Sequence, residues 1–103
     1  MKALLAAAAI VAALLTPALA AESVDERGRA AFTRNGCHGC HTVGRLGTPI
    51  GPDLSHVGVK YSSDDLARWL RDPAAISGTA HMPALELSAA DVAALTEYLA
   101  SLR

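Results

Sequence analysis

The sequence predicts a small all-α domain with three principal helices joined by long loops. Ser23, Ser62 and Ser88 each stand at the start of a segment with acidic residues in its first turn and apolar residues at helical spacing. No segment of the chain after the first twenty residues alternates between apolar and polar side chains as a half-buried strand would. At 103 residues the chain is long enough for one domain and too short for two.

The first twenty residues have the layout of a secretory signal peptide. A basic residue follows the initiator Met, residues 3–15 form a short apolar run, and Ala18-Leu19-Ala20 is a small-x-small cleavage site. An uncleaved membrane anchor is the alternative, but the run is mostly Ala and is interrupted by a proline. We therefore expect residues 1–20 to be removed on export, which leaves a mature domain of residues 21–103 in the periplasm with no membrane insertion.

The first predicted helix opens with the capping-box pair Ser23 and Glu26 and continues to about Thr33. From Cys37 to Tyr61 the chain is rich in glycine and proline, at positions Gly39, Gly44, Gly47, Pro49, Gly51, Pro52 and Gly58. This composition excludes long regular elements and predicts an irregular segment. An irregular segment of this length in so small a domain needs something to wrap around.

The second and third predicted helices lie in the C-terminal half. The second begins after Ser62, places Leu66, Trp69 and Leu70 on one face, and ends at Pro73. Residues 78–85 form another loop. Ser88 then precedes the last helix, whose apolar stripe consists of Val92, Leu95, Tyr98, Leu99 and Leu102.

The net charge and the length of the chain limit the classes of function that it can have. Nine basic and ten acidic residues give a net charge of −1, and loss of the signal peptide removes one more basic residue. The seven arginines are scattered and form no basic stripe, so we expect no binding to nucleic acid. A domain as short as residues 21–103 gains little stability from a hydrophobic core alone, so a covalent staple or a cofactor is expected.

Both cysteines fall in one pentapeptide, Cys37-His38-Gly39-Cys40-His41, which is the pattern of covalent c-type haem attachment. Two thiols at this spacing reach the two vinyl groups on one edge of a porphyrin, and the next residue offers an imidazole to the iron. A disulfide, a thioredoxin-like dithiol and a zinc site are the alternatives. A disulfide leaves the adjacent His41 unexplained, the dithiol lacks its βαβ context, and zinc lacks a second ligand pair at matching spacing.

Met82 is the candidate for the second axial ligand of the iron. It is the only methionine that remains after cleavage, and it lies in a loop directly before a proline, which favours an extended conformation at Met82. His81 and His56 are the alternatives, and an open axial site is the third. We expect His38, between the two thiols, to face solvent.

Four stretches occur in the order and spacing of one known family: Gly28-Arg29-Ala30-Ala31-Phe32 ahead of Asn35-Gly36-Cys37, then Gly51-Pro52-Asp53-Leu54, Met82-Pro83-Ala84-Leu85, and Leu95 through Leu99. On these residues the chain resembles a small class I bacterial monohaem cytochrome c over its whole mature length. The resemblance implies long loops wrapped around one covalent haem. The run from Ala67 to Pro73 is similar to cytochrome c domains fused to subunit II of terminal oxidases, which suggests a respiratory setting.

The resemblance also implies roles for individual residues. The first and last helices should cross with Gly28 and Phe32 against Leu95 and Tyr98. The carbonyl of Pro52 should accept a hydrogen bond from the ring of His41, and Leu54 should pack on the porphyrin. One or both of Tyr61 and Trp69 should bond a haem propionate, with core packing as the alternative. Asp53 departs from the Asn of many members, and no Thr stands two residues before Met82, departures that affect the reduction potential rather than the fold.

These expectations converge on electron transfer. With His41 and Met82 as axial ligands the iron has no free position for a substrate, so we expect a one-electron carrier and no enzyme. It would take electrons from a dehydrogenase or a bc-type complex and give them to a terminal oxidase or reductase. The haem edge near Cys37 and Cys40 would be the docking face, and rim charges would come from Arg34, Arg45 and Arg71.

Two alternative functions remain at this stage. One is a dedicated cytochrome subunit that stays bound to a periplasmic dehydrogenase, for example a sulfite-oxidising one. The other is a haem enzyme or a gas sensor with an open axial site, although no His or Arg is placed by a motif to act as a distal acid. We expect the free carrier to be a monomer that meets its redox partners only briefly.

Overall fold

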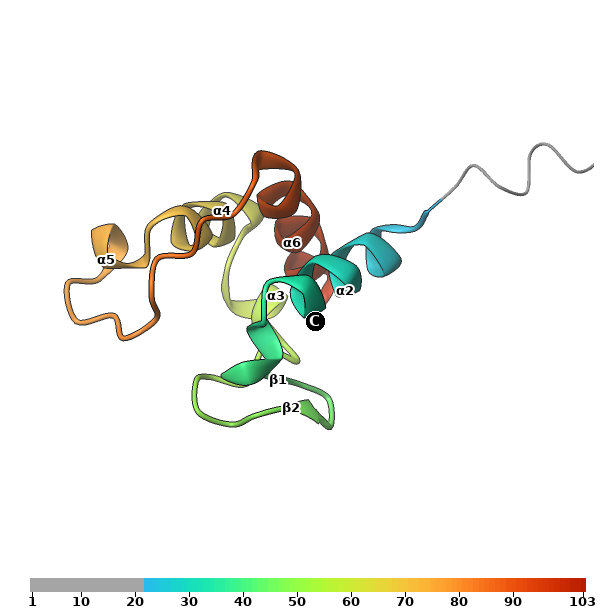
Figure 1. Ribbon diagram of the computed structural model, residues 1–103, viewed down its shortest axis with the longest axis horizontal. Coiled ribbons are helices and arrows are strands. Elements are labelled where there is room, and N and C mark those ends of the chain that lie inside the picture. Colours follow the sequence, from blue (N-terminus) through green and yellow to red (C-terminus); the bar gives the residue numbers. More distant parts are fainter. Residues whose placement is uncertain (1–21) are drawn as a thin grey trace, which may run out of the picture.

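The protein is described by a computed structural model that covers residues 22–103, so the predicted signal peptide of residues 1–20 lies outside the described residues. Three helices dominate this part of the chain, namely α2 (Val24–Arg34), α4 (Ser63–Arg71) and α6 (Ala89–Ser101). The short elements are the 3₁₀ helix η2 (Cys37–Gly39), strands β1 (Thr42–Val43) and β2 (Leu46–Gly47), and helices α3 (Val57–Lys60) and α5 (Pro73–Ile76). The predicted all-α class with three principal helices is confirmed (Figure 1).

The three main helices begin where their serines predict. The Oγ atoms of Ser23, Ser62 and Ser88 each accept a hydrogen bond from the backbone N–H three residues further on, at 3.0, 3.2 and 3.0 Å respectively. Each bond satisfies one of the N–H groups that a helix start leaves without a partner, and such a cap contributes about 1 kcal/mol. The helix starts are therefore fixed by local chemistry.

Two short elements differ from the sequence expectation. Strands β1 and β2 form an antiparallel pair with Thr42 opposite Gly47, joined by a turn in which Gly44 has a φ of +60°. Strands of two residues are too short to show an alternating pattern, so the sequence did not reveal them. Pro73 lies beyond the end of α4 but also begins α5, because the first position of a helix tolerates a residue without an N–H.

The hydrophobic core lies mainly between α2, α4 and α6. Figure 1 shows α2 and α6 packed across each other, with α4 on the other side of α6. Phe32 of α2 is 1% exposed, and its ring meets that of Tyr98 edge-on with centroids 6.1 Å apart. The buried apolar residues are Ala31, Phe32, Val57, Leu66, Leu70, Val92, Leu95, Tyr98 and Leu99. The crossing of the first and last helices that the resemblance implied is confirmed.

Gly28 allows α2 and α6 to approach closely. A Cβ atom at this position would lie 2.0 Å from Cβ of Tyr98, far too close for two carbon atoms that are not bonded to each other. The Cβ of Tyr98 is fixed to its helix, so only a movement of the helices could relieve the contact. The close approach therefore requires a glycine, in spite of its low helix propensity.

We expect Gly28→Ala to destabilise the domain by about 3 kcal/mol or more, above the usual cost of overpacking because the backbone must move. The measurement is the midpoint of denaturant-induced unfolding of the haem-loaded protein. Thr33→Ala, at an exposed position of the same helix, is the control and should change the midpoint little. A Gly28→Ala protein as stable as the wild type would contradict the crossing described here.

Within residues 22–103, no helix is both long enough and apolar enough to cross a membrane.

Candidate haem-binding site

The two cysteines lie on a tight turn at the end of α2. Gly36 ends the helical direction with a φ of +72°, and η2 follows at once. The carbonyl of Cys37 accepts hydrogen bonds from the N–H groups of Cys40 and His41, at 3.2 and 3.0 Å. Both thiols are free, with Cys37 half-buried and Cys40 exposed. Burial raises the pKa of the Cys37 thiol above its ordinary value.

The ring of His41 is held by the backbone of Pro52. The Nδ1 atom of His41 lies 2.7 Å from the Pro52 carbonyl oxygen. Because a carbonyl oxygen can only accept, Nδ1 carries the proton and donates it. The lone pair of Nε2 is therefore free, which is the state that an imidazole needs in order to bind a metal. The predicted contact between His41 and Pro52 is confirmed.

Two glycines of the irregular segment, residues 37–61, allow its backbone to pack closely around His41. The N–H of Gly51 donates to the carbonyl of Cys40 at 2.5 Å, and a Cβ atom on Gly51 would lie 2.8 Å from Cε1 of the His41 ring. Gly47 has a φ of +108°, and its Cβ would lie 2.0 Å from the His41 carbonyl oxygen. The sequence predicted an irregular segment here, and the structure explains two of its glycines by their closeness to His41.

Asp53 organises the turn that carries Pro52. Its carboxylate accepts hydrogen bonds from the backbone N–H and the hydroxyl of Ser55, at 3.0 and 2.6 Å, and from the hydroxyl of Thr42 at 3.1 Å. The bonds from Ser55 are the main cause that lowers the pKa of Asp53. All three hydrogen bonds end on Oδ1, and the negative charge of the carboxylate makes them stronger than bonds to the amide oxygen of the Asn that many members have here.

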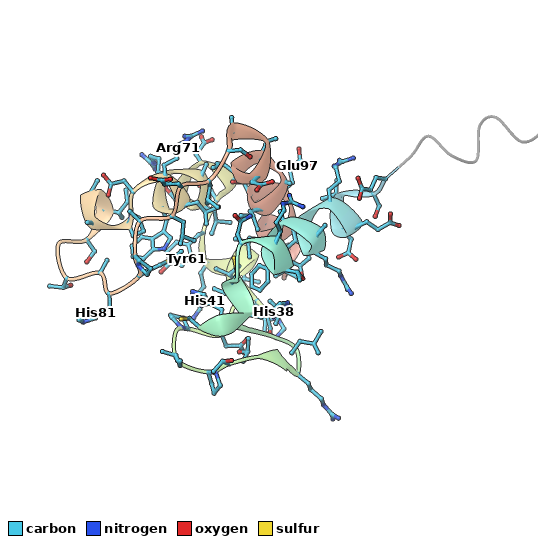
Figure 2. The ribbon with its side chains drawn as sticks, in the orientation of Figure 1. His38, His41, Tyr61, Arg71, His81 and Glu97 are labelled. Atoms are coloured by element: carbon cyan, nitrogen blue, oxygen red, sulfur yellow. The ribbon has the colours of Figure 1, made fainter. Side chains whose placement is uncertain are left out.

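Met82 lies on a different segment, the loop between α5 and α6, and is half-buried against the core. Its sulfur accepts a hydrogen bond from the indole Nε1–H of Trp69 on α4, with 3.2 Å between nitrogen and sulfur. The two alternative ligands, His56 and His81, are both exposed. Figure 2 shows His41 and His81 on separate segments, with His81 at the edge of the molecule.

The structure places the two candidate donors to a haem propionate differently. Trp69 directs its only donor to Met82, a contact that the sequence did not predict, while its bond to a propionate stays a prediction. Tyr61 is 54% exposed, so the alternative that it packs in the core is wrong. Its bond to a propionate stays a prediction. Leu54 is half-buried and packs against the core cluster.

His38 does not face solvent, so that expectation is wrong. The residue is half-buried, and its ring meets Phe32 edge-on with centroids 4.5 Å apart and planes at 73°. Its Nδ1 atom is buried and has no hydrogen-bond partner in the part of the chain that the structure describes. The edge-on contact with Phe32 holds the His38 ring in this orientation, and it also packs the cysteine turn against α2.

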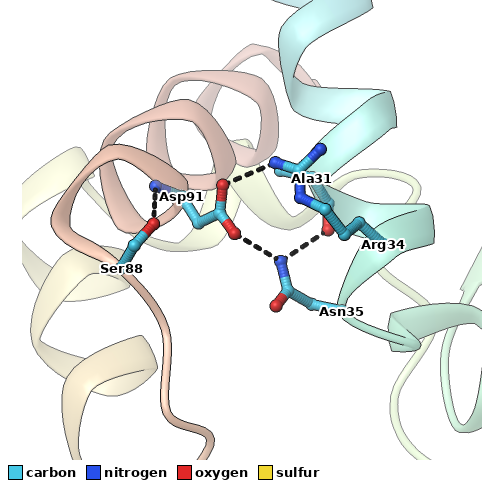
Figure 3. Close-up of polar contacts among 5 residues, drawn as sticks. All are labelled: Ala31, Arg34, Asn35, Ser88 and Asp91. Atoms are coloured by element: carbon cyan, nitrogen blue, oxygen red, sulfur yellow. Dashed lines mark hydrogen bonds and ion pairs between the residues drawn. The ribbon is translucent and has the colours of Figure 1, made fainter.

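A polar cluster joins the end of α2, just before Cys37, to the start of α6 (Figure 3). The carboxylate of Asp91 accepts hydrogen bonds from the guanidinium of Arg34 at 2.6 Å and from the side-chain amide of Asn35 at 3.0 Å. The same amide also donates to the Ala31 carbonyl at 2.8 Å. Arg34 is therefore paired within the molecule, but its side chain is 59% exposed, so its place among the rim charges stays a prediction.

The Asp91 cluster makes stability depend on pH. The hydrogen bonds from Arg34 and then Asn35 lower the pKa of Asp91, so its contribution is present above the ordinary carboxyl pKa and is lost as the pH falls through the lowered value. We expect Asp91→Asn to unfold at a lower denaturant concentration than the wild type at pH 7. The difference in unfolding midpoint should start to narrow below about pH 4, where the carboxyl of the unfolded chain takes up a proton, and should close once the pH is below the lowered pKa of Asp91 in the folded protein.

The check on this prediction is a comparison of unfolding midpoints across pH. The contributions of all other carboxylates cancel between the two proteins. If the difference in unfolding midpoint between the two proteins stays constant from pH 7 to about pH 2, the negative charge of Asp91 does not contribute to stability. Asp64→Asn, at an exposed position in the first turn of α4, is the matched control.

The alternative zinc site has no ligand set here. Among residues 22–103, no group of three or more His, Cys, Asp or Glu side chains is placed to hold a metal ion. The donors that do come together suit a different group. Two free thiols on one turn and an adjacent imidazole with a free Nε2 fit a porphyrin attached by its vinyl groups and ligated through its iron.

A helical domain with this turn and this imidazole defines the class of covalent c-type haem proteins. Comparison with known proteins agrees, because residues 26–103 match the family described as Cytochrome c. The chain belongs to the cytochrome c family, and with its Cys-x-x-Cys-His motif this membership implies a covalently bound haem c.

One relative is the protein named cytochrome c oxidase subunit 2 from Alkalihalophilus pseudofirmus. It is 35% identical to this chain over 91 residues. The match covers 80% of this chain but 27% of that protein, so the chain spans about a quarter of its relative's length. The predicted similarity to cytochrome c domains of oxidase subunit II is confirmed.

Proposed function

We propose that residues 21–103, exported by a signal peptide of residues 1–20, form a periplasmic one-electron carrier with one covalent haem c. The observation that carries the proposal is the bond of His41 to Pro52, directly after the cysteine turn. It leaves Nε2 as the free ring nitrogen and restricts the orientation of the imidazole. Two free thiols beside an imidazole held in one orientation are the groups that attach and ligate a covalent haem.

In this proposal Cys37 and Cys40 would form the thioether bonds to the haem, and His41 and Met82 would bind its iron. When bound, the haem supplies an iron that gains or loses one electron between Fe(III) and Fe(II). The Pro52 carbonyl polarises the imidazole of His41 and makes it a stronger donor to the iron. The thioether of Met82 favours the reduced state and raises the reduction potential.

The protein's part in the reaction is to hold both ligands still. The irregular segment, residues 37–61, packs closely around His41 at Gly47 and Gly51. The indole of Trp69 donates a hydrogen bond to the sulfur of Met82. Ligands that move little keep the reorganisation on electron transfer small. With both axial positions filled by side chains, the site binds no substrate, so we propose a carrier and not an enzyme.

The partners follow from the same reasoning. A dehydrogenase or a bc-type complex would supply the electron, and a terminal oxidase or reductase would accept it. The relative is a subunit of an oxidase by name, which supports a terminal oxidase as the acceptor. Docking would occur near the exposed Cys40, with Arg45 and Arg71 as exposed rim charges, and the carrier would act as a monomer.

The experiment is the visible spectrum of periplasmically expressed protein, oxidised and reduced, extended to the far-red band that reports sulfur bound to ferric haem. We expect a covalent haem spectrum and the far-red band together. A haem spectrum without that band would overturn Met82 as a ligand and favour a His ligand or an open-site sensor. Absence of haem from protein made with the attachment machinery would overturn the whole proposal.

A further inference from the structure

We infer that Asp53 is a positioning residue for His41, because its carboxylate holds two neighbouring segments in the register that aims the Pro52 carbonyl at Nδ1 of the imidazole. The inference rests on the proposed function, since it requires His41 to bind the iron. It deepens that function by naming a residue outside the ligand set that controls how strongly His41 donates to the iron.

The segment that begins with His41 and the segment that begins with Pro52 are held together in one register. Three hydrogen-bonded pairs share a separation of eleven residues: His41 with Pro52, Thr42 with Asp53, and Gly44 with Ser55. A constant separation means that the two segments run side by side in the same direction. A slip by one residue would move the Pro52 carbonyl away from the ring, so the register decides whether Nδ1 keeps its acceptor.

Asp53 is the centre of this register. Its Oδ1 accepts hydrogen bonds from the hydroxyl of Thr42, the residue directly after His41, and from the N–H and hydroxyl of Ser55. The Ser55 hydroxyl oxygen in turn accepts from the N–H of Gly44 at 2.7 Å, so the network returns to the first segment. Hydrogen bonds to an ionised acceptor are about twice as strong as neutral ones, which lets this network persist although Asp53 is exposed to water.

The direction of the effect follows from the bond that the register supports. A carbonyl acceptor at Nδ1 of His41 makes the imidazole a stronger donor through Nε2, and a stronger donor favours ferric iron. Without the Asp53 carboxylate the Pro52 carbonyl aligns less well with Nδ1, and the imidazole becomes a weaker donor. The ratio of reduced to oxidised protein at a fixed solution potential should therefore rise.

Three variants and one control separate positioning from charge. Asp53→Ala removes the anchor, while Asp53→Asn keeps an acceptor oxygen without the charge. Thr42→Val removes one bond of the network at constant net charge and nearly constant shape. Asp64→Ala is the matched control, because it removes the same charge from an exposed position on α4. The haem-loaded proteins are compared in 1 M salt, where a Debye length of about 3 Å screens the direct effect of an exposed charge.

Two measurements report the role. The ratio of reduced to oxidised protein should rise about two- to fivefold in Asp53→Ala and by less in Thr42→Val, where tenfold corresponds to 59 mV for one electron. Exchange of the His41 Nδ1 proton with solvent, followed by NMR in protein labelled with ¹⁵N-histidine, should become several-fold faster in the same two variants. Asp53→Asn should lie closer to the wild type than Asp53→Ala in both measurements, and Asp64→Ala should match the wild type.

Every other result overturns the inference. An unchanged potential and an unchanged exchange rate in Asp53→Ala would mean that other contacts set the register. Equal shifts in Asp53→Asn and Asp53→Ala, with Thr42→Val at the wild-type values, would mean that Asp53 acts only through its charge. If Asp53→Ala does not fold, Thr42→Val decides, and wild-type values in that variant overturn the inference. If wild-type protein made with the attachment machinery contains no haem, the proposed function has failed, and the inference fails with it for that separate reason.

Discussion

Replacing Cys37 and Cys40 together by serine should abolish covalent haem and leave the domain largely unfolded. The reason lies in where the polypeptide buries its residues. No residue from 37 to 56 is fully buried, and the core is supplied by helices α2, α3, α4 and α6. Packing of the polypeptide alone therefore contributes little to order in this segment, and a domain of this size has little stability to spare.

The measurements are the haem content of the denatured protein and far-ultraviolet circular dichroism of the native protein. Gly39→Ala is the matched control, because it alters the same turn while a Cβ there meets nothing within 4 Å. We expect the control to retain covalent haem and its helical signal. A well-folded double variant without haem would contradict the haem-dependent fold and revive a structural module as the alternative.

The features predicted correctly from sequence are those fixed by neighbours in the chain. A capping serine and its N–H partner are three residues apart, so all three main helix starts could be located. The residues from Cys37 to His41 are contiguous, so the haem-attachment motif could be recognised from the sequence alone. The contact of His41 with Pro52 spans eleven residues and was reached only through the family resemblance.

The features that the sequence did not predict depend on how distant segments meet. Arg34 was expected only as a rim charge, and its pairing with Asp91, 57 residues away across the helix crossing, was not predicted. Trp69 lies at a helical position consistent with core packing, and only the path of the following loop brings Met82 to its N–H. His38 packs on Phe32 because the turn at Gly36 redirects the chain, an angle that residue types alone do not specify.

Replacing Met82 by alanine should keep the covalent haem and lower the reduction potential by on the order of 0.1–0.2 V, a fraction of the roughly 0.8 V range that axial ligation controls. Loss of the thioether removes the ligand that favours Fe(II). It also leaves an axial position to small external ligands, so the reduced variant should bind carbon monoxide, which the wild type should exclude. Redox titration and carbon monoxide difference spectra measure the two effects.

The control variants are His81→Ala and His56→Ala, which remove the two alternative ligands. Both residues are exposed, so neither substitution should disturb the fold, and both proteins should keep the wild-type potential and exclude carbon monoxide. A Met82→Ala protein with an unchanged potential would show that the sulfur does not bind the iron. A fall in potential in His81→Ala or His56→Ala instead would assign the axial position to that histidine, and the indole of Trp69 would then hold a methionine that has only a packing role.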